Sequence, residues 1–517
     1  EYLSNNWVKT PDDAFNSTVN VHNPRQCHTT MNWSRYLSLY QLGLGARGIG
    51  FRDSSQDVMG VVAGMPEDAK ALMKKLLSVQ LPNGSAMHQF FPLTMEATEG
   101  DSREEGDKQW YGDDHLWIVQ AVSAYVKETG DVAFLSEEIT YYSKELPLEE
   151  REEGTVLDHL KRALAFSKTH TGAHGLPLLG FADWNDCVNL KGDAESVMIA
   201  NLYGRALLEM IELMDYMGDE VAAAQYRADH AQMKEVMNES VWDGEWFMRY
   251  FEEDGTPIGS NQNSEGKIYT NAQSWSVIAG FAEGERAKQA LDSVHDKLNT
   301  PRGIKISWPG YNGFDPAKGG ITTYPPGAKE NGGIFLHSNP WVMIAETLVG
   351  NGDRAFQYYN QINPAAQNEQ MERFECEPYC YPQNILGDEH PQFGLARNSW
   401  LSGTSSWMYQ AATKYILGII PTHEGLQVSP CIPKGWDGFE VTRKFRGSTY
   451  QIVVKNPSHV SKGIESMRVD GQEVFSALVP VFTDGGVHTV EVTMGDSSAL
   501  SDTADGALDE DAGKRKV

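Results

Sequence analysis

The spacing of apolar side chains changes once along this chain, and that change constrains the fold more than any other feature. Up to about Gly418, apolar residues recur every three to four positions, which is the repeat of an amphipathic helix. Beyond Gly418 they alternate with polar residues, which is the repeat of a half-buried strand. A chain of 517 residues is long enough for about three domains. We therefore predict a multidomain, mainly α-helical protein that ends in a β-sandwich.

The helical part contains segments with clear ends. From Asp193 to Met217 the apolar positions share one face, and Gly218 supplies a left-handed stop. In the segment 114–129, Asp114 is a candidate cap and Gly130 a candidate end. Further helices are predicted at 68–78, 156–168, 220–241, 271–299, 341–349 and 400–417. About a dozen helices separated by long loops indicate a toroid of paired inner and outer helices.

The C-terminal part has the signature of antiparallel strands. The alternating segments are 439–442, 449–454 and 489–493, and the Asp470-Gly471 pair predicts a hairpin turn. The expected boundaries are a linker at 1–28, a catalytic helical domain at 29–418, the β-sandwich at 419–495 and a tail at 496–517. That tail is rich in Ser, Asp, Ala and Gly, a composition typical of disordered segments.

The charge of the chain excludes two classes of partner. Asp and Glu number 71 against 43 Lys and Arg, which gives a net charge of −28. Such a field repels nucleic-acid backbones and anionic lipid, so we expect neither nucleic-acid nor membrane binding. The start of the chain has no secretion signal, and no apolar run reaches the length of a membrane helix. We therefore expect a cytoplasmic protein.

The cysteine and acidic clusters do not predict a metal site. Five cysteines form an odd and sparse set, which fits a reducing compartment. Cys376 and Cys380 have the spacing of half a zinc site, but no second Cys/His pair completes it. The run 113–115, Asp-Asp-His, resembles a metal cluster, although Asp114 is already explained as a helix cap. No metal is expected.

A loop in the range 176–190 carries the residues of glycosyl-transfer chemistry. Asp183 and Asp186 flank Trp184 between Gly and Pro residues. Glycosyl transfer needs a carboxylic acid that protonates a leaving oxygen, and burial against an aromatic ring keeps such a group protonated near neutral pH. The alternative is a turn with two capping Asp residues.

A second cluster lies at 45–57. Arg47, Arg52, Asp53 and Asp57 fall within eleven residues, and side chains of these types bind sugar hydroxyls through paired hydrogen bonds. The alternative is a cluster of surface ion pairs.

A third cluster lies in the long loop 308–337. Lys329 and His337 offer donors, and Gly332-Gly333 permits a close approach of the backbone to a ligand. This combination suits inorganic phosphate, whereas the alternative is a solvated Lys beside a structural His.

Together, these motifs follow the order found in a known family. They lie at 50–57, 113–117, 175–180, 183–186, 329–335 and 400–404. The chain resembles the inverting disaccharide phosphorylases of glycoside hydrolase family ninety-four, which includes cellobiose, cellobionic-acid and chitobiose phosphorylases. The resemblance extends from about Asn20 to Pro457.

The resemblance implies a catalytic (α/α)6 barrel followed by a C-terminal jelly-roll sandwich. It also implies that Asp186 is the general acid and that Trp184 contacts the donor sugar. The other implied contacts are Arg47, Asp53, Glu330 and Gln383 for sugar, with Arg52 beside them, and Lys329, His337, Ser402 and Gly403 for phosphate. The family often has Thr where this chain has Ser402, which keeps the hydroxyl. Phosphate is a co-substrate, and no cofactor is implied.

The predicted activity is inverting phosphorolysis of a β-linked disaccharide. Cellobiose or cellobionic acid is favoured because the sequences at 23–27 and at 186–187 are closer to those of the glucosyl-specific members. An aldonic acceptor would need its own cation, for which Lys191 is the candidate. The products are an α-sugar 1-phosphate and a free sugar.

Three alternatives remain open. The first is a chitobiose phosphorylase. The second is an inverting hydrolase, which needs another carboxylate to activate water, with Asp113, Glu330 and Glu377 as candidates. The third is a non-catalytic carbohydrate-binding fragment, because members of the family usually carry an N-terminal β-sandwich before the barrel and this chain opens near the barrel entrance. A homodimer is also expected, since the family commonly dimerises through that region.

Overall fold

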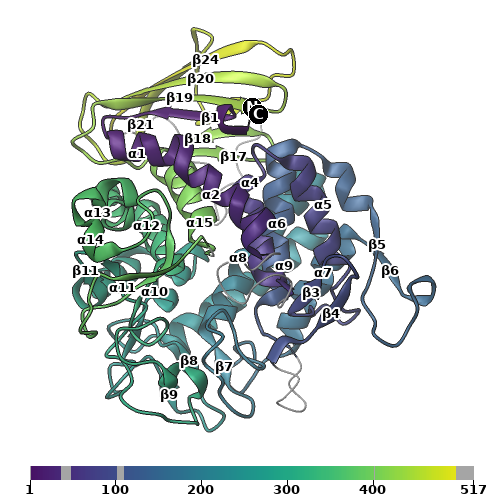
Figure 1. The fold of residues 1–517 in the computed structure, drawn as a ribbon. Helices are drawn as coiled ribbons and strands as arrows, with labels where there is room; N and C mark the ends of the chain where they lie inside the picture. The colour runs from purple at the N-terminus through teal and green to yellow at the C-terminus, as the bar shows by residue number, and fades with distance from the viewer. Residues whose placement is uncertain (1, 36–47, 102–109, 401, 497–517) are drawn as a thin grey trace.

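The computed structural model describes residues 2–35, 48–101, 110–400 and 402–496. Its helices form one large body and its longest strands lie together across one end of that body (Figure 1). The structure is thus helix-rich and multidomain, with a C-terminal sheet region, as predicted from the change in apolar spacing.

Six helices form a closed cycle of contacts within the described residues, in which each packs against the next and the last packs against the first. These ring helices are α4 (Phe51–Val61), α6 (Asp114–Thr129), α8 (Val197–Met217), α10 (Thr270–Ile278), α12 (Asn339–Leu348) and α15 (Thr404–Gln410). Their residues are almost all buried. In α4, Asp53 is the exception, and it faces the cavity described below.

A second set of helices packs against the ring. It consists of α2 (Asn23–Thr29), α5 (Pro66–Leu77), α7 (Val156–Thr169), α9 (Glu220–Val236), α11 (Gly284–Leu298) and α13 (Gly352–Ile362). These helices are amphipathic: in α5 only Ala69, Met73, Leu76 and Leu77 are buried. An apolar stripe against the ring and a polar face toward solvent explain the repeat of three to four residues in the sequence.

Four tryptophans from four ring helices meet in the core: Trp117, Trp275, Trp341 and Trp407. Their ring centroids lie 5.2 to 6.2 Å apart, mostly edge to face. Edge-to-face pairs of large aromatic rings add to the stabilisation that burial alone provides. Trp184, which lines the cavity, packs against this tryptophan cluster, with its ring centroid 4.9 Å from that of Trp341. The cluster therefore supports the cavity wall.

The predicted helix ends are confirmed at two glycines, and two predicted segments differ from the structure. Gly130 and Gly218 adopt φ 75° and end α6 and α8. The single helix predicted at 271–299 is in fact α10 and α11, because Gly280 takes a left-handed conformation and Gly284 another. The segment predicted at 400–417 begins later, at Thr404, and continues beyond α15 as a π-helical turn.

The C-terminal strands form a six-stranded sheet in the order β1-β19-β20-β24-β21-β22. The strands are β1 (Asn6–Lys9), β19 (Gly438–Phe445), β20 (Ser448–Lys455), β21 (Ile464–Val469), β22 (Gln472–Val474) and β24 (Val487–Met494). A second sheet contains β17 (Ile419–Pro421), β18 (Gly425–Val428) and β23 (Leu478–Pro480). The hairpin at Asp470-Gly471 is confirmed.

Two features of this sheet were not predicted. Strand β24 runs parallel to β20, whereas all strands were expected to be antiparallel. Strand β1, near the start of the chain, pairs with β19 along its whole length. The segment predicted as a linker therefore joins the C-terminal sheet to the helical part.

None of the described helices is both long and apolar enough to cross a membrane. In the same part of the chain, no group of three or more His, Cys, Asp or Glu side chains is placed to hold a metal ion. All five cysteines are free thiols.

Candidate active site

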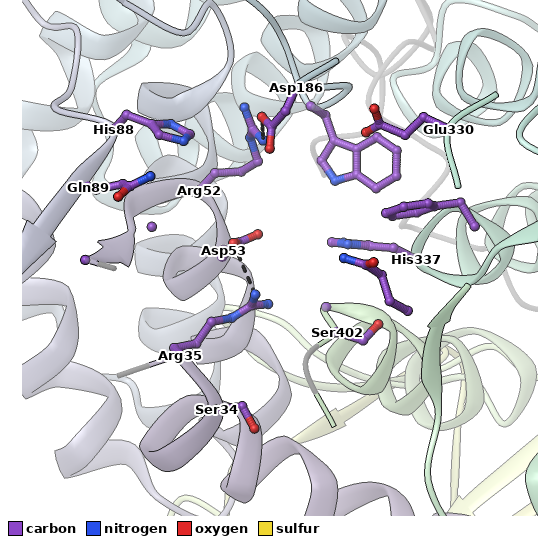
Figure 2. A pocket seen from close by; sticks show the side chains of 16 residues that line it. Ser34, Arg35, Arg52, Asp53, His88, Gln89, Asp186, Glu330, His337 and Ser402 are labelled. Atoms are coloured by element: carbon purple, nitrogen blue, oxygen red, sulfur yellow. Dashed lines mark hydrogen bonds and ion pairs between the residues drawn. The ribbon is translucent and has the colours of Figure 1, made fainter. Parts of the chain in front are cut away.

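A cavity of about 130 Å³ lies where several ring helices begin (Figure 2). Arg52 and Asp53 come from the first turn of α4, His337 lies just before α12, and Ser402 and Gly403 lie just before α15. The N-terminal end of a helix carries a partial positive charge, so α4 and α12 favour an anion in this cavity. Figure 2 shows Asp186 and Ser402 on opposite sides of it.

The two aspartates of the loop 183–186 have different surroundings. Asp183 is fully buried and accepts two hydrogen bonds from Arg249, at 2.7 and 3.0 Å, and others from Ser196 and Tyr250. Although burial opposes it, the Arg249 guanidinium lowers the pKa of Asp183. The side chain of Asp186, by contrast, is 48% exposed and lines the cavity. Asp183 therefore anchors the loop, and Asp186 is available to a ligand.

Arg52 connects Asp186 to the buried end of α6. Its Nη1 donates to Asp186 Oδ1 at 2.7 Å. Its Nη2 donates to Asp113 Oδ1 and to the carbonyl of Asp183, both at 2.9 Å. Asp114 bonds instead to His88 Nδ1 at 2.9 Å and is the first residue within α6, so the predicted helix cap is wrong.

Arg35 forms a second ion-pair group at the cavity. It donates to Asp57 at 2.8 Å and to Asp53 at 3.1 Å. Although burial opposes it, Arg35 and Arg52 together lower the pKa of Asp53, whose side chain is 39% exposed. Asp53 is thus an ionised acceptor that faces the cavity, a suitable partner for sugar hydroxyls.

Glu330 is the buried acid of the cavity. It is 7% exposed, and its Oε2 accepts from the backbone N–H of Cys187 at 3.3 Å. Burial, together with the charge of Asp186, raises the pKa of Glu330 to about 7. The sequence analysis expected a buried acid beside an aromatic ring at Asp186, and the structure places the buried acid at Glu330.

His337 is held as a neutral ring with one defined tautomer. Trp407 Nε1, which can only donate, lies 2.7 Å from Gln56 Oε1, and His337 Nε2 lies 2.8 Å from the same oxygen. His337 Nε2 therefore carries the hydrogen. Burial lowers the pKa of His337 to about 3, so the ring is uncharged at neutral pH.

Most of the predicted site residues line this one cavity: Arg52, Asp53, Trp184, Asp186, Glu330, Gln383, His337, Ser402 and Gly403. Lys329 is not among the lining residues of this cavity. Its ammonium lies 5.3 Å from the centre of the Tyr324 ring. Arg47 lies outside the described residues.

The sequence analysis missed Arg35, His88 and Gln89, which also line the cavity. Arg35 was overlooked because it belongs to a helical segment placed before the ring, where no motif marked it. The pairing of Arg35 with Asp53 and Asp57 of α4 becomes visible only in the folded chain. His88 lies between Met87 and Gln89, just before β3 (Gln89–Phe91), and no motif marked it.

Comparisons with known proteins show the family of this chain. The family model described as the glycosyl hydrolase 94 superfamily, catalytic domain, matches residues 1–418. The N,N′-diacetylchitobiose phosphorylase of Vibrio proteolyticus is 36% identical over 506 residues, which cover 94% of this chain and 62% of that protein. The solabiose phosphorylase of Paenibacillus borealis is 34% identical over 472 residues, 90% of this chain and 59% of that protein. This chain thus spans about three-fifths of the length of the curated relatives it matches.

A solved structure also has a similar fold. The GH78 family rhamnosidase of Bacillus sp. GL1 superposes with a TM-score of 0.54 at 13% identity, over 95% of this chain and 44% of that one. At this identity, the similarity concerns the fold alone. The family match over most of the chain is the stronger evidence, and it shows that this chain belongs to the glycosyl hydrolase 94 superfamily through its catalytic domain.

Proposed function

We propose that this protein cleaves a β-linked disaccharide with inorganic phosphate and inverts the anomeric carbon. The observation that carries the proposal is the arrangement of the cavity. A solvent-accessible carboxylate, Asp186, stands on one side, and the beginning of a helix with Ser402 and Gly403 stands on the other. The relatives named as phosphorylases, at 34 to 36% identity, support the same reaction class. We further propose that the ring of helices is an (α/α)6 barrel and that the C-terminal sheets are a jelly roll.

In the proposed step, Asp186 gives its proton to the glycosidic oxygen while a phosphate oxygen attacks the anomeric carbon from the opposite face. The bond from that carbon to the leaving oxygen breaks as the bond to phosphate forms. The products are an α-sugar 1-phosphate and a free sugar. Phosphate is already an anion, so the reaction needs no carboxylate base, in contrast to inverting hydrolysis.

The remaining side chains divide between the two substrates. Arg52, Asp53, Trp184, Glu330 and Gln383 hold the donor sugar, with Arg35 behind Asp53, and His337, Ser402 and Gly403 hold phosphate. The hydrolase alternative is disfavoured because two of its candidate bases are occupied. Asp113 is fully buried against Arg52, and Glu377 accepts from Trp400 Nε1 at 3.0 Å.

Two donor sugars remain in the proposal. The sequence motifs favour a β-1,4-glucosyl disaccharide, and the Vibrio proteolyticus relative is named for N,N′-diacetylchitobiose. The test is synthesis from α-glucose 1-phosphate or its N-acetyl analogue with glucose, gluconate and N-acetylglucosamine as acceptors, with phosphate release as the signal. Turnover of either donor supports the phosphorylase, and the preferred pair identifies the substrate. Phosphate release at the same rate with and without an acceptor sugar would contradict the phosphorylase proposal.

Gly403 is a sharp test of the phosphate side. A Cβ at this position would lie 2.2 Å from His337 Cε1 and 2.7 Å from both ring nitrogens. The ring cannot retreat without losing its hydrogen bond to Gln56. Gly403→Ala is therefore expected to raise the KM for phosphate at least about tenfold, with a smaller change for the sugar. Gly435→Ala is the control, because nothing lies within 4 Å of a Cβ there. Equal effects of the two variants would remove Gly403 from the site.

Replacements of Lys329 and of His337 are expected to have different effects on the phosphate KM, although both residues lie in the loop 308–337. His337→Ala removes a side chain of the cavity and should raise the phosphate KM about three- to tenfold, the range for one lost hydrogen bond. Lys329→Ala should leave the phosphate KM unchanged, because its ammonium lies over Tyr324. Initial rates at varied phosphate test both, and a raised KM in Lys329→Ala would return this residue to the phosphate site.

A further inference from the structure

We propose that Asp113 is a positioning residue that allows Asp186 to hold its proton, because Asp113 neutralises the Arg52 guanidinium that lies between the two carboxylates. This inference rests on the proposed function, in which Asp186 acts as an acid. It assigns to the first aspartate of the motif 113–117 a role in the reaction without contact to the substrate.

The geometry shows one arginine shared by two carboxylates. Arg52 Nε and Nη2 contact Asp113 Oδ2 and Oδ1, at 2.8 and 2.9 Å. Arg52 Nη1 contacts Asp186 Oδ1 at 2.7 Å. Arg52 thus forms an ion pair with Asp113, with one hydrogen bond from Nη2, and donates to Asp186 with Nη1.

Asp113 is fixed in place from behind. It is fully buried, and Trp117 Nε1 donates to its Oδ2 at 2.8 Å. Trp117 is part of the tryptophan cluster, so this carboxylate cannot turn away from Arg52. Both of its oxygens accept hydrogen bonds, which is the arrangement of an ionised carboxylate.

The electrostatic consequence concerns Asp186. A guanidinium is always charged, and a positive charge within hydrogen-bond distance favours the ionised form of a carboxyl group. An acid in that position would lose the proton that it must deliver. A fixed negative charge on the far side of Arg52 offsets this effect, and the offset is strong because the pair is shielded from water.

The titration of Asp113 itself supports this arrangement. Burial, opposed by Arg52, raises the pKa of Asp113 to about 7. Its negative charge is therefore present above neutral pH. Asp114 does not take over this role, since it is paired with His88 and lies 3.7 Å from Arg52 Nε.

Other titratable groups also face Asp186, and the test must separate them. They are Arg52, His88, Tyr111, Cys187, Tyr324 and Glu330. Burial, together with the charges of neighbouring groups, raises the pKa of Tyr111, Cys187 and Tyr324 well above their usual values, so these three stay neutral over the working range. Glu330, with a pKa of about 7, is the neighbouring acid whose titration must be controlled.

The experiment is the pH profile of kcat for Asp113→Asn. The amide keeps the shape but loses the charge, so Arg52 should pull Asp186 toward its ionised form. The alkaline limb of the profile is expected to move to lower pH by about one unit or more. Arg52→Gln should move the same limb to higher pH, and the double variant should lie between the two. An unmoved limb in both single variants, or movement in the same direction, would overturn the inference.

Three controls make the result specific. Asp57→Asn breaks another buried aspartate–arginine pair, with Arg35, and should leave the alkaline limb in place. The Asp113→Asn shift should persist in a Glu330→Gln background, which removes the competing titration. The leaving group of a dinitrophenyl glycoside needs no proton. With this substrate the Asp113→Asn variant should therefore have the same rate of phosphorolysis as the unmodified protein. Slow turnover there would assign Asp113 a purely structural role.

Failure of the inference and failure of the proposed function give different results. If the unmodified protein forms no sugar 1-phosphate at any pH, the proposed function is wrong. If the unmodified protein forms sugar 1-phosphate and Asp113→Asn leaves the alkaline limb of its pH profile in place, the proposed function is retained and the proposed role of Asp113 is wrong. Circular dichroism of each variant confirms that the fold is retained.

Discussion

Asp186→Asn is expected to lower kcat for phosphorolysis of the natural disaccharide about 10²- to 10⁴-fold while the protein stays folded. The amide has the shape of the carboxyl group and keeps an oxygen for Arg52, but it cannot deliver a proton to the glycosidic oxygen. The side chain is half exposed, so its replacement leaves no cavity in the core. The measurement is the initial rate of sugar 1-phosphate formation at saturating phosphate.

A change of leaving group provides the control for this variant. A dinitrophenyl glycoside departs without a proton, so Asp186→Asn should recover most of its rate with that substrate. Retention of most activity on the natural disaccharide would show that another group supplies the proton, and Glu330, with its pKa of about 7, would be the first candidate.

Arg249→Met is expected to destabilise the protein by about 3–5 kcal/mol, the cost of leaving a buried charge without its partner. Arg249 and Asp183 both have fully buried side chains, and Met cannot replace the two hydrogen bonds between them. The loop 183–186 should loosen as a result, so kcat should fall as well. Urea denaturation measures the change in the free energy of unfolding.

A surface pair provides the comparison for Arg249. Arg227 pairs with Asp215, and their side chains are 40% and 46% exposed. Arg227→Met is therefore expected to cost less than about 1 kcal/mol. If the two variants lost similar stability, the Asp183–Arg249 pair would not be the anchor of the loop.

The sequence predicted those parts of the fold that local chemistry decides. Gly130 and Gly218 end their helices because glycine adopts the left-handed conformation without the steric strain that a Cβ atom causes, and this preference is local. The same rule failed at 271–299, where small apolar residues continued the helical repeat across Gly280. The parallel pairing of β24 with β20 is set by sheet topology, which period-two alternation does not encode.

The site was predictable where its residues form motifs and hidden where they meet only in space. Asp186 and Trp184 stood out because they lie together in a loop between Gly and Pro residues. The contact of Arg52 with Asp186 joins positions 134 apart in the sequence, and that of Arg249 with Asp183 joins positions 66 apart. Lys329 does not line the cavity although the adjacent Glu330 does, because adjacency in a motif does not determine the direction in which a side chain points.

The most direct test of the central claim is the fate of a β-linked disaccharide with and without inorganic phosphate, followed by proton and phosphorus NMR. Cellobiose, cellobionic acid and N,N′-diacetylchitobiose are the substrates to compare. The expected result is an α-sugar 1-phosphate and one free sugar, formed from at least one of them and only when phosphate is present. Cleavage at the same rate without phosphate, or a β-sugar 1-phosphate as the first product, would contradict inverting phosphorolysis.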